Sequence, residues 1–143
     1  MSNYLVVAHQ TADSSELIDT MLAKMDKDTE AQFVLLVPAT RIEELRRPLE
    51  PDRRANAERI ATNAAYAYKD EEVRLLRMSV GDESPLIAIQ EEVAARPGFY
   101  SEVIISTLPV DFSKWLEMDL PGKVKATFDL PVTHVYGGVT TVE

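Results

Sequence analysis

Five short apolar runs, separated by segments with helical periodicity, constrain the fold of this chain more than any other feature of its sequence. The runs cover residues 4–8, 33–37, 73–80, 103–105 and 132–135. The first, second and fourth are apolar at consecutive positions, which a strand tolerates only when both of its faces are covered. We therefore expect these three strands to be central. The third run contains Arg74, Arg77 and Ser79 and suits the edge of a sheet.

The segments between the runs carry apolar residues at helical spacing and begin with residues that cap helices. Asp13, with Glu16 three residues later, is the expected N-cap of the first helix. The other helical segments are an alanine-rich stripe at 57–68, a segment that begins at Ser84-Pro85, and a short one from Asp119 to the break at Leu130-Pro131. Strict alternation of strands and helices predicts a doubly wound α/β domain, a five-stranded parallel sheet with helices on both faces.

Size and composition narrow the function classes. A chain of 143 residues is the usual size of one domain, so we expect a single domain over residues 1–143. Its formal net charge of −9 disfavours nucleic acid and anionic membranes as partners. The absence of cysteine excludes disulfides and thiolate metal sites, and two histidines leave little for a metal, so none is expected. The start of the chain lacks the pattern of a signal peptide, which favours a cytoplasmic location.

Ligands of doubly wound domains bind outside the carboxyl ends of the strands, so the polar segments at these ends are the candidate site. The segment after the first run, residues 9–15, contains no glycine and cannot form the loop of a dinucleotide-binding or P-loop protein. It ends in a helix N-terminus, which can hold an anion. Its Asp13 either occupies that position as a cap, the favoured interpretation, or leaves it to a ligand carboxylate or phosphate.

Two further segments follow the third and fourth runs. Gly81 and Asp82 lead into a capped helix, and a tight strand-to-helix turn is the favoured explanation for them. Ser106 and Thr107 place hydroxyl groups at the end of the fourth run, and the same segment offers further ligand groups. These are the hydroxyl of Ser113, the cation of Lys114, and the rings of Phe112 and Trp115. The aromatic rings could cover a flat ligand, but packing against the domain is the favoured interpretation.

Catalysis and phosphotransfer are both disfavoured. An enzyme built on His9, Asp13 and Ser14 would need an orienting third group, which the sequence does not supply, so we expect no enzymatic activity. A response-regulator receiver would need an acidic pair after the first strand, where His9 and Gln10 stand. His134, in the middle of the last run, is expected to pack or to lie at a subunit contact.

The arrangement resembles the universal stress protein family over nearly the whole chain. The resemblance rests on residues 4–8, on Gly81-Asp82, on Val103 to Ser106, and on the last strand after Pro131. It implies a UspA-like domain of the universal stress protein and adenine nucleotide alpha hydrolase-like fold. It also implies frequent homodimers through the last strand, here Val132, His134 and Tyr136.

In one branch of that family, ATP is held by a G-x-x-G-x9-G-[ST] loop after the fourth strand. This chain has no glycine between Gly98 and Gly122, so the loop is absent, and His9-Gln10 stands where ATP-binding members carry an aspartate. The primary hypothesis is a non-enzymatic regulatory or interaction domain in stress response, homodimeric and not an ordinary ATP binder. The alternative is a nucleotide or small-anion binder with a modified loop, and ATP is then the cofactor to test. Its site would comprise His9, Gln10, Asp13, Val37, Gly81, Asp82, Ser106, Thr107, Ser113 and Lys114.

Overall fold

A computed structural model describes residues 2–39, 53–108, 115 and 119–137. Strands and helices alternate along the chain, as the periodicity predicts. The strands are β1 (Asn3–Val7), β2 (Gln32–Pro38), β3 (Leu75–Gly81), β4 (Glu102–Thr107) and β5 (Val132–Tyr136). The helices are α1 (Ser15–Lys27), α2 (Arg53–Asp70), α3 (Pro85–Ala95) and α5 (Leu120–Phe128).

The strands form one five-stranded sheet in the order β3-β2-β1-β4-β5, and all four neighbouring pairs are parallel. The predicted fold class is therefore confirmed. The three strands with consecutive apolar residues occupy the centre, and β3 and β5 are the edges. The third run, which is more polar than the others, is an edge strand, as predicted, and its Leu76 and Met78 side chains are exposed.

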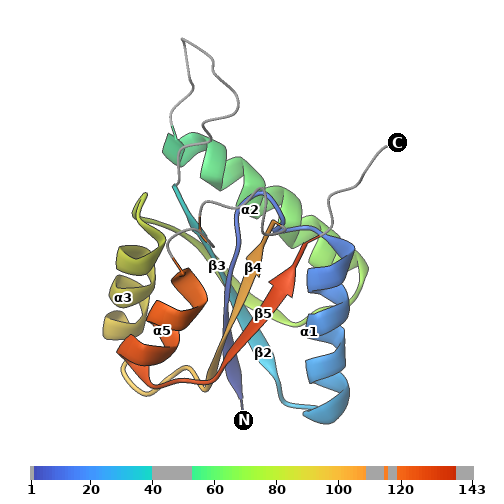
Figure 1. The fold of residues 1–143 in the computed structure, drawn as a ribbon. Coiled ribbons are helices and arrows are strands. Elements are labelled where there is room, and N and C mark those ends of the chain that lie inside the picture. Colours follow the sequence, from blue (N-terminus) through green and yellow to red (C-terminus); the bar gives the residue numbers. More distant parts are fainter. Residues whose placement is uncertain (1, 40–52, 109–114, 116–118, 138–143) are drawn as a thin grey trace.

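Helices cover both faces of the sheet, with α1 and α2 on one side and α3 and α5 on the other (Figure 1). Each face has its own apolar core. Tyr4, Val6, Phe33 and Leu35 point toward α1 and α2, whereas Leu5, Val7, Val34 and Leu36 point toward α3 and α5. Alternate residues of one strand thus enter opposite cores, which explains why the central strands are apolar at every position.

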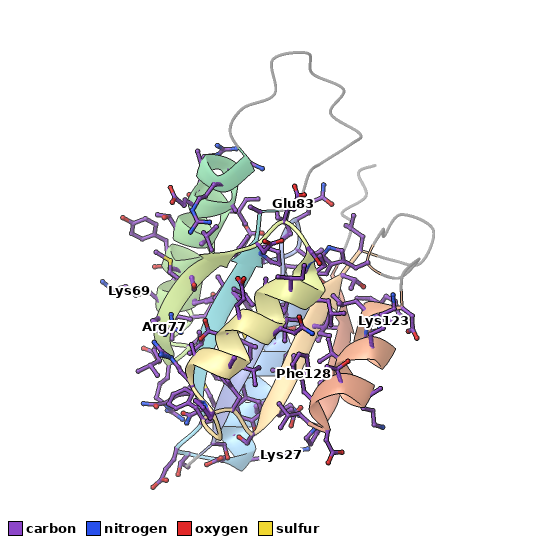
Figure 2. The ribbon with its side chains drawn as sticks, turned by 90° about the vertical axis from the view of Figure 1, so that its left-hand side faces the viewer. Lys27, Lys69, Arg77, Glu83, Lys123 and Phe128 are labelled. Carbon is purple, nitrogen blue, oxygen red and sulfur yellow. The ribbon has the colours of Figure 1, made fainter. Side chains whose placement is uncertain are left out.

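The ends of α3 and α5 follow from local sequence. Ser84 caps α3 by accepting a hydrogen bond from the backbone N–H of Ile87 at 3.4 Å. Asp119 caps α5 through the N–H of Gly122, also at 3.4 Å, and α5 ends at Asp129, which has left-handed backbone (φ 54°). The predicted cap at Ser84 and the predicted helix start at Asp119 are both confirmed. In Figure 2, α3 and α5 lie side by side in front of the sheet.

Within the part of the chain that the structure describes, no helix is long and apolar enough to cross a membrane.

Candidate functional site

The strand order creates one switch point in the sheet. From β1 the chain proceeds to β2 and β3 on one side, and then returns to β4 and β5 on the other. Connections from β1 and β4 therefore diverge, and the space outside their carboxyl ends is where a doubly wound domain binds ligands. The described segments there are the β1–α1 loop, residues 8–14, and the end of β4.

The β1–α1 loop is built from two tight turns. The carbonyl of His9 accepts the N–H of Ala12 at 3.1 Å, and the carbonyl of Thr11 accepts the N–H of Ser14 at 3.0 Å. These turns put Ser14 in extended backbone, from which its hydroxyl accepts the N–H of Leu17 at 3.2 Å. Ser14 is therefore the N-cap of α1. The prediction that Asp13 is the cap is wrong, because the second turn ends at Ser14 and leaves Asp13 exposed.

A hydroxyl pair bridges the switch point. The Oγ1 of Thr11 and the Oγ of Ser106 are 2.5 Å apart and both residues are buried. Gly137, directly after β5, also packs on Thr11, because a Cβ added at Gly137 would lie 2.4 Å from the Cβ of Thr11. The N–H of Gly137 donates to the carbonyl of Thr107 at 2.7 Å. The loop after β1, the end of β4 and the residue after β5 are thus joined to one another by side chains and backbone of the protein itself.

Helix α2 contacts the same β1–α1 loop through Tyr68. The hydroxyl of Tyr68 donates to the carbonyl of Ala12 at 2.5 Å, and the Tyr68 side chain is fully buried. Burial, with a smaller contribution from the charge of Asp13, raises the pKa of this phenol far above its ordinary value. Tyr68 therefore remains a neutral donor at all ordinary pH values and fixes the position of the loop.

His134 lies beside the switch point, on the edge strand β5. Its Nε2 is 2.8 Å from the Oγ1 of Thr107, and its ring lies 4.3 Å from the ring of Tyr136, centroid to centroid. Burial lowers the pKa of His134. The imidazole is therefore neutral near pH 7.

The end of β3 has a structural explanation for each polar residue. Gly81 packs against α3 so closely that an added Cβ would lie 2.7 Å from the Cβ of Ala88. Asp82 accepts the N–H of Ser84 at 2.9 Å, and Ser84 caps α3. Glu83 lies at the same end of the molecule (Figure 2). The turn that the sequence predicts here is confirmed, because its residues serve the junction between strand and helix.

The predicted site residues divide into four groups. His9, Ser106 and Thr107 lie buried at the switch point, with Gln10 and Asp13 exposed on the same loop. The side chain of Val37 lies in the core that faces α1 and α2, beneath the edge of the sheet. Gly81 and Asp82 lie at the end of β3, two strands away from β1. Ser113, Lys114 and Phe112 fall outside the described residues.

Trp115 is described, and it is buried in the core that faces α3 and α5. This favours packing over a ligand cage for that ring. Three residues that shape the switch point were not predicted: Thr11, Tyr68 and Gly137. The position of Gly137, directly after an apolar strand, is the one signal in the sequence that could have drawn attention to it.

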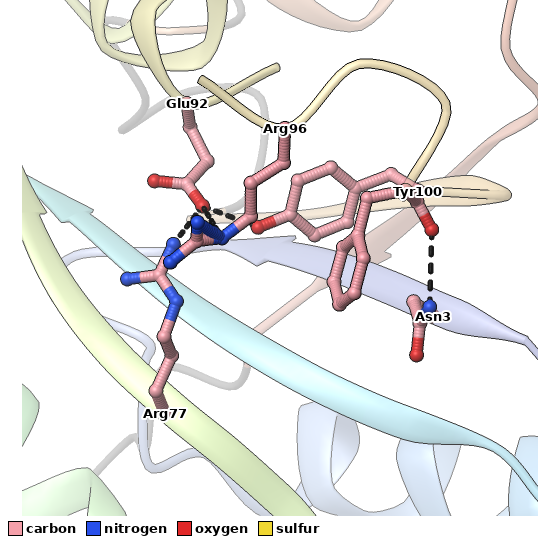
Figure 3. A network of polar contacts seen from close by, with 6 residues as sticks. Asn3, Arg77, Glu92, Arg96 and Tyr100 are labelled. Atoms are coloured by element: carbon pink, nitrogen blue, oxygen red, sulfur yellow. Dashed lines mark hydrogen bonds and ion pairs between the residues drawn. The ribbon is translucent and has the colours of Figure 1, made fainter. Parts of the chain in front are cut away.

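A buried ionic network lies on the α3 face, at the opposite end of the sheet from the switch point. Figure 3 shows the carboxylate of Glu92 with its partners from β3 and from the chain after α3. It accepts hydrogen bonds from the guanidinium of Arg77 and from the hydroxyl of Tyr100. The Nε of Arg96 lies 3.7 Å away from the same oxygen. Burial and the bond to Glu92 raise the pKa of Tyr100.

In the described ranges, no three His, Cys, Asp or Glu residues are grouped so that they could hold a metal ion.

Comparison with solved structures identifies the fold. A universal stress protein from Archaeoglobus fulgidus superposes with a TM-score of 0.61 at 11% sequence identity, over 94% of this chain and 93% of that one. A universal stress protein in complex with cAMP superposes with a TM-score of 0.58 at 15% sequence identity, over 95% of this chain and 98% of that one. No family model and no curated protein sequence matches the chain. The chain therefore has the fold of the universal stress proteins, as the sequence resemblance implied.

Proposed function

We propose that this chain is a non-enzymatic regulatory or interaction domain of the universal stress protein type. The observation that carries the proposal is the hydroxyl bridge between Thr11 and Ser106, which joins the ends of β1 and β4. A ligand phosphate at a switch point is held by backbone N–H groups that it approaches closely. Here the protein's own side chains meet at that position, and Gly137 packs against them.

A role without catalysis fits the use of the polar groups in the β1–α1 loop. The hydroxyl of Ser14, the nucleophile that the sequence places near His9, accepts the N–H of Leu17 and caps α1. The hydroxyls of Thr11 and Ser106 form a hydrogen bond with each other. These groups stabilise the loop, and a catalytic arrangement would require a nucleophile, a base and an orienting group in contact.

A homodimer through β5 is the second part of the proposal. β5 is an edge strand, and its Tyr136 side chain is 49% exposed. An exposed edge with an apolar side chain is a template for pairing with another chain. A second copy of the domain would cover it.

Nucleotide binding is the alternative function, and one comparison favours it. The universal stress protein of that comparison is in complex with cAMP. A cyclic mononucleotide carries a single phosphodiester and needs fewer backbone contacts than the triphosphate of ATP. Ser106, Thr107, Ser113 and Lys114 would then replace the glycine-rich loop.

Isothermal titration calorimetry separates the two functions. We expect no heat of binding from ATP with Mg²⁺ up to about 1 mM ligand, where an affinity as weak as about −4 kcal/mol is half-saturating. cAMP is titrated in parallel, and mass spectrometry of the purified protein checks for a nucleotide that is already bound. Micromolar binding that is lost in Lys114→Ala, but kept in the control Lys123→Ala on the exposed side of α5, would overturn the primary proposal in favour of the alternative.

A further inference from the structure

Among the described residues no strand pairs with the outer edge of β5, and this edge presents its backbone groups at alternate positions. The N–H of Val103 donates to the carbonyl of Pro131 at 3.0 Å, and the N–H of Gly137 donates to the carbonyl of Thr107 at 2.7 Å. Along a strand, successive residues direct their backbone groups to opposite sides. The odd-numbered positions from 131 to 137 therefore pair with β4, and Val132, His134 and Tyr136 direct their N–H and C=O groups outward.

The side chains at these three positions form a row on the face of the sheet that α3 and α5 cover. Val132 and His134 pair in register with Val103 and Ile105, whose side chains lie in that core. Val132 and His134 are half-buried, and Tyr136 is exposed. The strand contains no charged side chain, in a chain whose net charge is −9. A second copy can therefore approach this edge without bringing like charges together.

The opposite edge is less suited to pairing. β3 carries the charged Arg77, and its register with β2 shifts between Phe33 and Val34. Bulges and charges are the devices by which edge strands avoid further pairing. The register of β5 with β4 is unbroken from Val132 to Tyr136. Of the two edges, β5 is the one that fits a second copy.

One antiparallel register uses every outward group of β5. When the twofold axis passes through His134, Val132 lies opposite Tyr136 of the second copy, and His134 lies opposite His134 of the second copy. All three outward positions of each strand then form hydrogen-bonded pairs. Residues directly opposite in such a pair have Cβ atoms about 4.5–5.5 Å apart, on the same face of the sheet. The two imidazoles would therefore be neighbours.

We propose that His134 makes this homodimer sensitive to pH, because protonation places two positive charges opposite each other across the twofold axis. The inference rests on the β5 homodimer of the proposed function and adds its regulation. It follows from the position of the histidine at the centre of a five-residue edge strand. Like charges directly opposite each other in an antiparallel pair destabilise the pairing.

The described surroundings of His134 offer no carboxylate partner that would stabilise the charged form. On the sheet it faces the hydroxyl of Thr107 and the ring of Tyr136. Helix α5, on the same face, contributes the buried Val124, and its Lys123 and Lys125 are exposed. The remaining charged groups on elements packed against β5 lie elsewhere. They are Asp119 and Asp129, which cap the two ends of α5, Glu102, bonded to Thr133 and Lys24 at the start of β4, and Glu16, Asp19, Asp26 and Lys27 on α1, which covers the other face.

The direction of the pH effect follows from these surroundings. Burial already lowers the pKa of His134 in the single chain. Further burial and a neighbouring imidazole lower the pKa again in the dimer. Dimerisation therefore releases protons, so the dimer is weakened as the pH falls through the lowered pKa that His134 has in the single chain, which lies below the ordinary histidine value of about 6.5.

Sedimentation equilibrium at about pH 7.5 and about pH 5 tests this inference, because the lowered pKa of His134 moves its change of charge toward the acidic end of the histidine range. We expect the dimer dissociation constant of the unmodified chain to rise at least about tenfold at the lower pH, as two groups are protonated. His134→Gln keeps a polar, uncharged group beside Thr107 and should dimerise equally at both pH values. His134→Lys should be monomeric at both. Circular dichroism establishes that each variant is folded.

The outcomes distinguish this inference from the proposal on which it rests. A monomer at the higher pH would overturn the β5 homodimer and the inference together. A dimer with the same dissociation constant at both pH values would overturn the inference alone. A pH dependence that persists in His134→Gln would also overturn it, because His9 is then the remaining histidine.

Discussion

Glu92 gathers partners from three parts of the chain onto one buried carboxylate. Arg77 comes from β3, Arg96 follows α3, and Tyr100 belongs to the connection to β4. A buried carboxylate is stable only when its hydrogen bonds are complete. The residue therefore ties the packing of α3 on the sheet to the start of β4, although the sequence shows it only as one of several acidic residues on a helix.

Replacement of Glu92 by alanine should destabilise the domain, because it leaves Arg77 and Tyr100 without their acceptor. We expect a loss of about 2–3 kcal/mol in the free energy of unfolding, near the lower end for a broken buried ion pair. Urea denaturation measures it. The matched control is Glu91→Ala, at the neighbouring exposed position of α3, with an expected change within about 0.5 kcal/mol. Equal losses in both variants would contradict a role for the network.

Tyr68 should limit stability at high pH. Its pKa is raised by burial, so the unfolded chain ionises at about pH 10 while the folded chain does not. Its contribution is fully present below pH 10 and is lost as the pH rises toward the folded pKa. The free energy of unfolding should fall by about 1.4 kcal/mol per pH unit for this group.

Tyr68→Phe tests that dependence. Between about pH 10 and about pH 11, the free energy of unfolding of this variant should fall less steeply with pH than that of the unmodified chain. The difference in slope should correspond to about one bound proton. At neutral pH it should cost about 1 kcal/mol, because the carbonyl of Ala12 loses its donor. Tyr66→Phe is the control, since that side chain is 68% exposed. An unchanged slope in Tyr68→Phe would show that other groups dominate at high pH.

At the scale of elements, two neighbouring residues, Asp13 and Ser14, are both of a type that caps helices, but only Ser14 caps α1. Ser14→Ala removes the side chain that accepts the N–H of Leu17 and should cost about 1 kcal/mol in unfolding experiments. Asp13→Ala, one position earlier and exposed, should cost less than half of that. A larger loss in Asp13→Ala than in Ser14→Ala would indicate that Asp13 caps α1 and would contradict the loop geometry.

Strands and most helix ends could be predicted from the sequence because their causes are local. Consecutive apolar residues identified the central strands, and Ser84 and Asp119 identified two helix starts. The start of α1 was predicted one residue early, because two turns within the β1–α1 loop decide which residue is extended. No local pattern contains that information.

The candidate site was harder to predict than the fold. Thr11 and Ser106 are 95 positions apart, and they meet because β1 and β4 pair in register. Tyr68 reaches the same loop from α2 across 56 positions. These contacts depend on the strand order, which apolar periodicity leaves open. The sequence therefore placed His9, Ser106 and Thr107 at one edge, but it did not reveal what joins them.

For the whole molecule, the two edges of the sheet predict how copies associate. Tyr136→Lys places a charge on the β5 edge opposite Val132 of the second copy and should raise the dimer dissociation constant at least about tenfold. Met78→Lys places the same charge on β3, where the side chain is 41% exposed, and should leave dimerisation unchanged. Analytical ultracentrifugation at neutral pH compares them. Loss of the dimer in Met78→Lys alone would assign the interface to β3.

The central position of β1 also has a consequence for synthesis of the chain. During translation β1 is made before both of its neighbours and can pair with β2 soon after, but its other neighbour is β4, and Asn3 bonds to Ser101 across 98 positions. At ~5–20 residues per second, translation from the end of β2 to the end of β4 takes roughly 3–14 seconds. During that interval one edge of an apolar strand has no partner within the nascent chain. Folding that depends on such distant contacts is slow, so this domain is most exposed to aggregation before its second half is made.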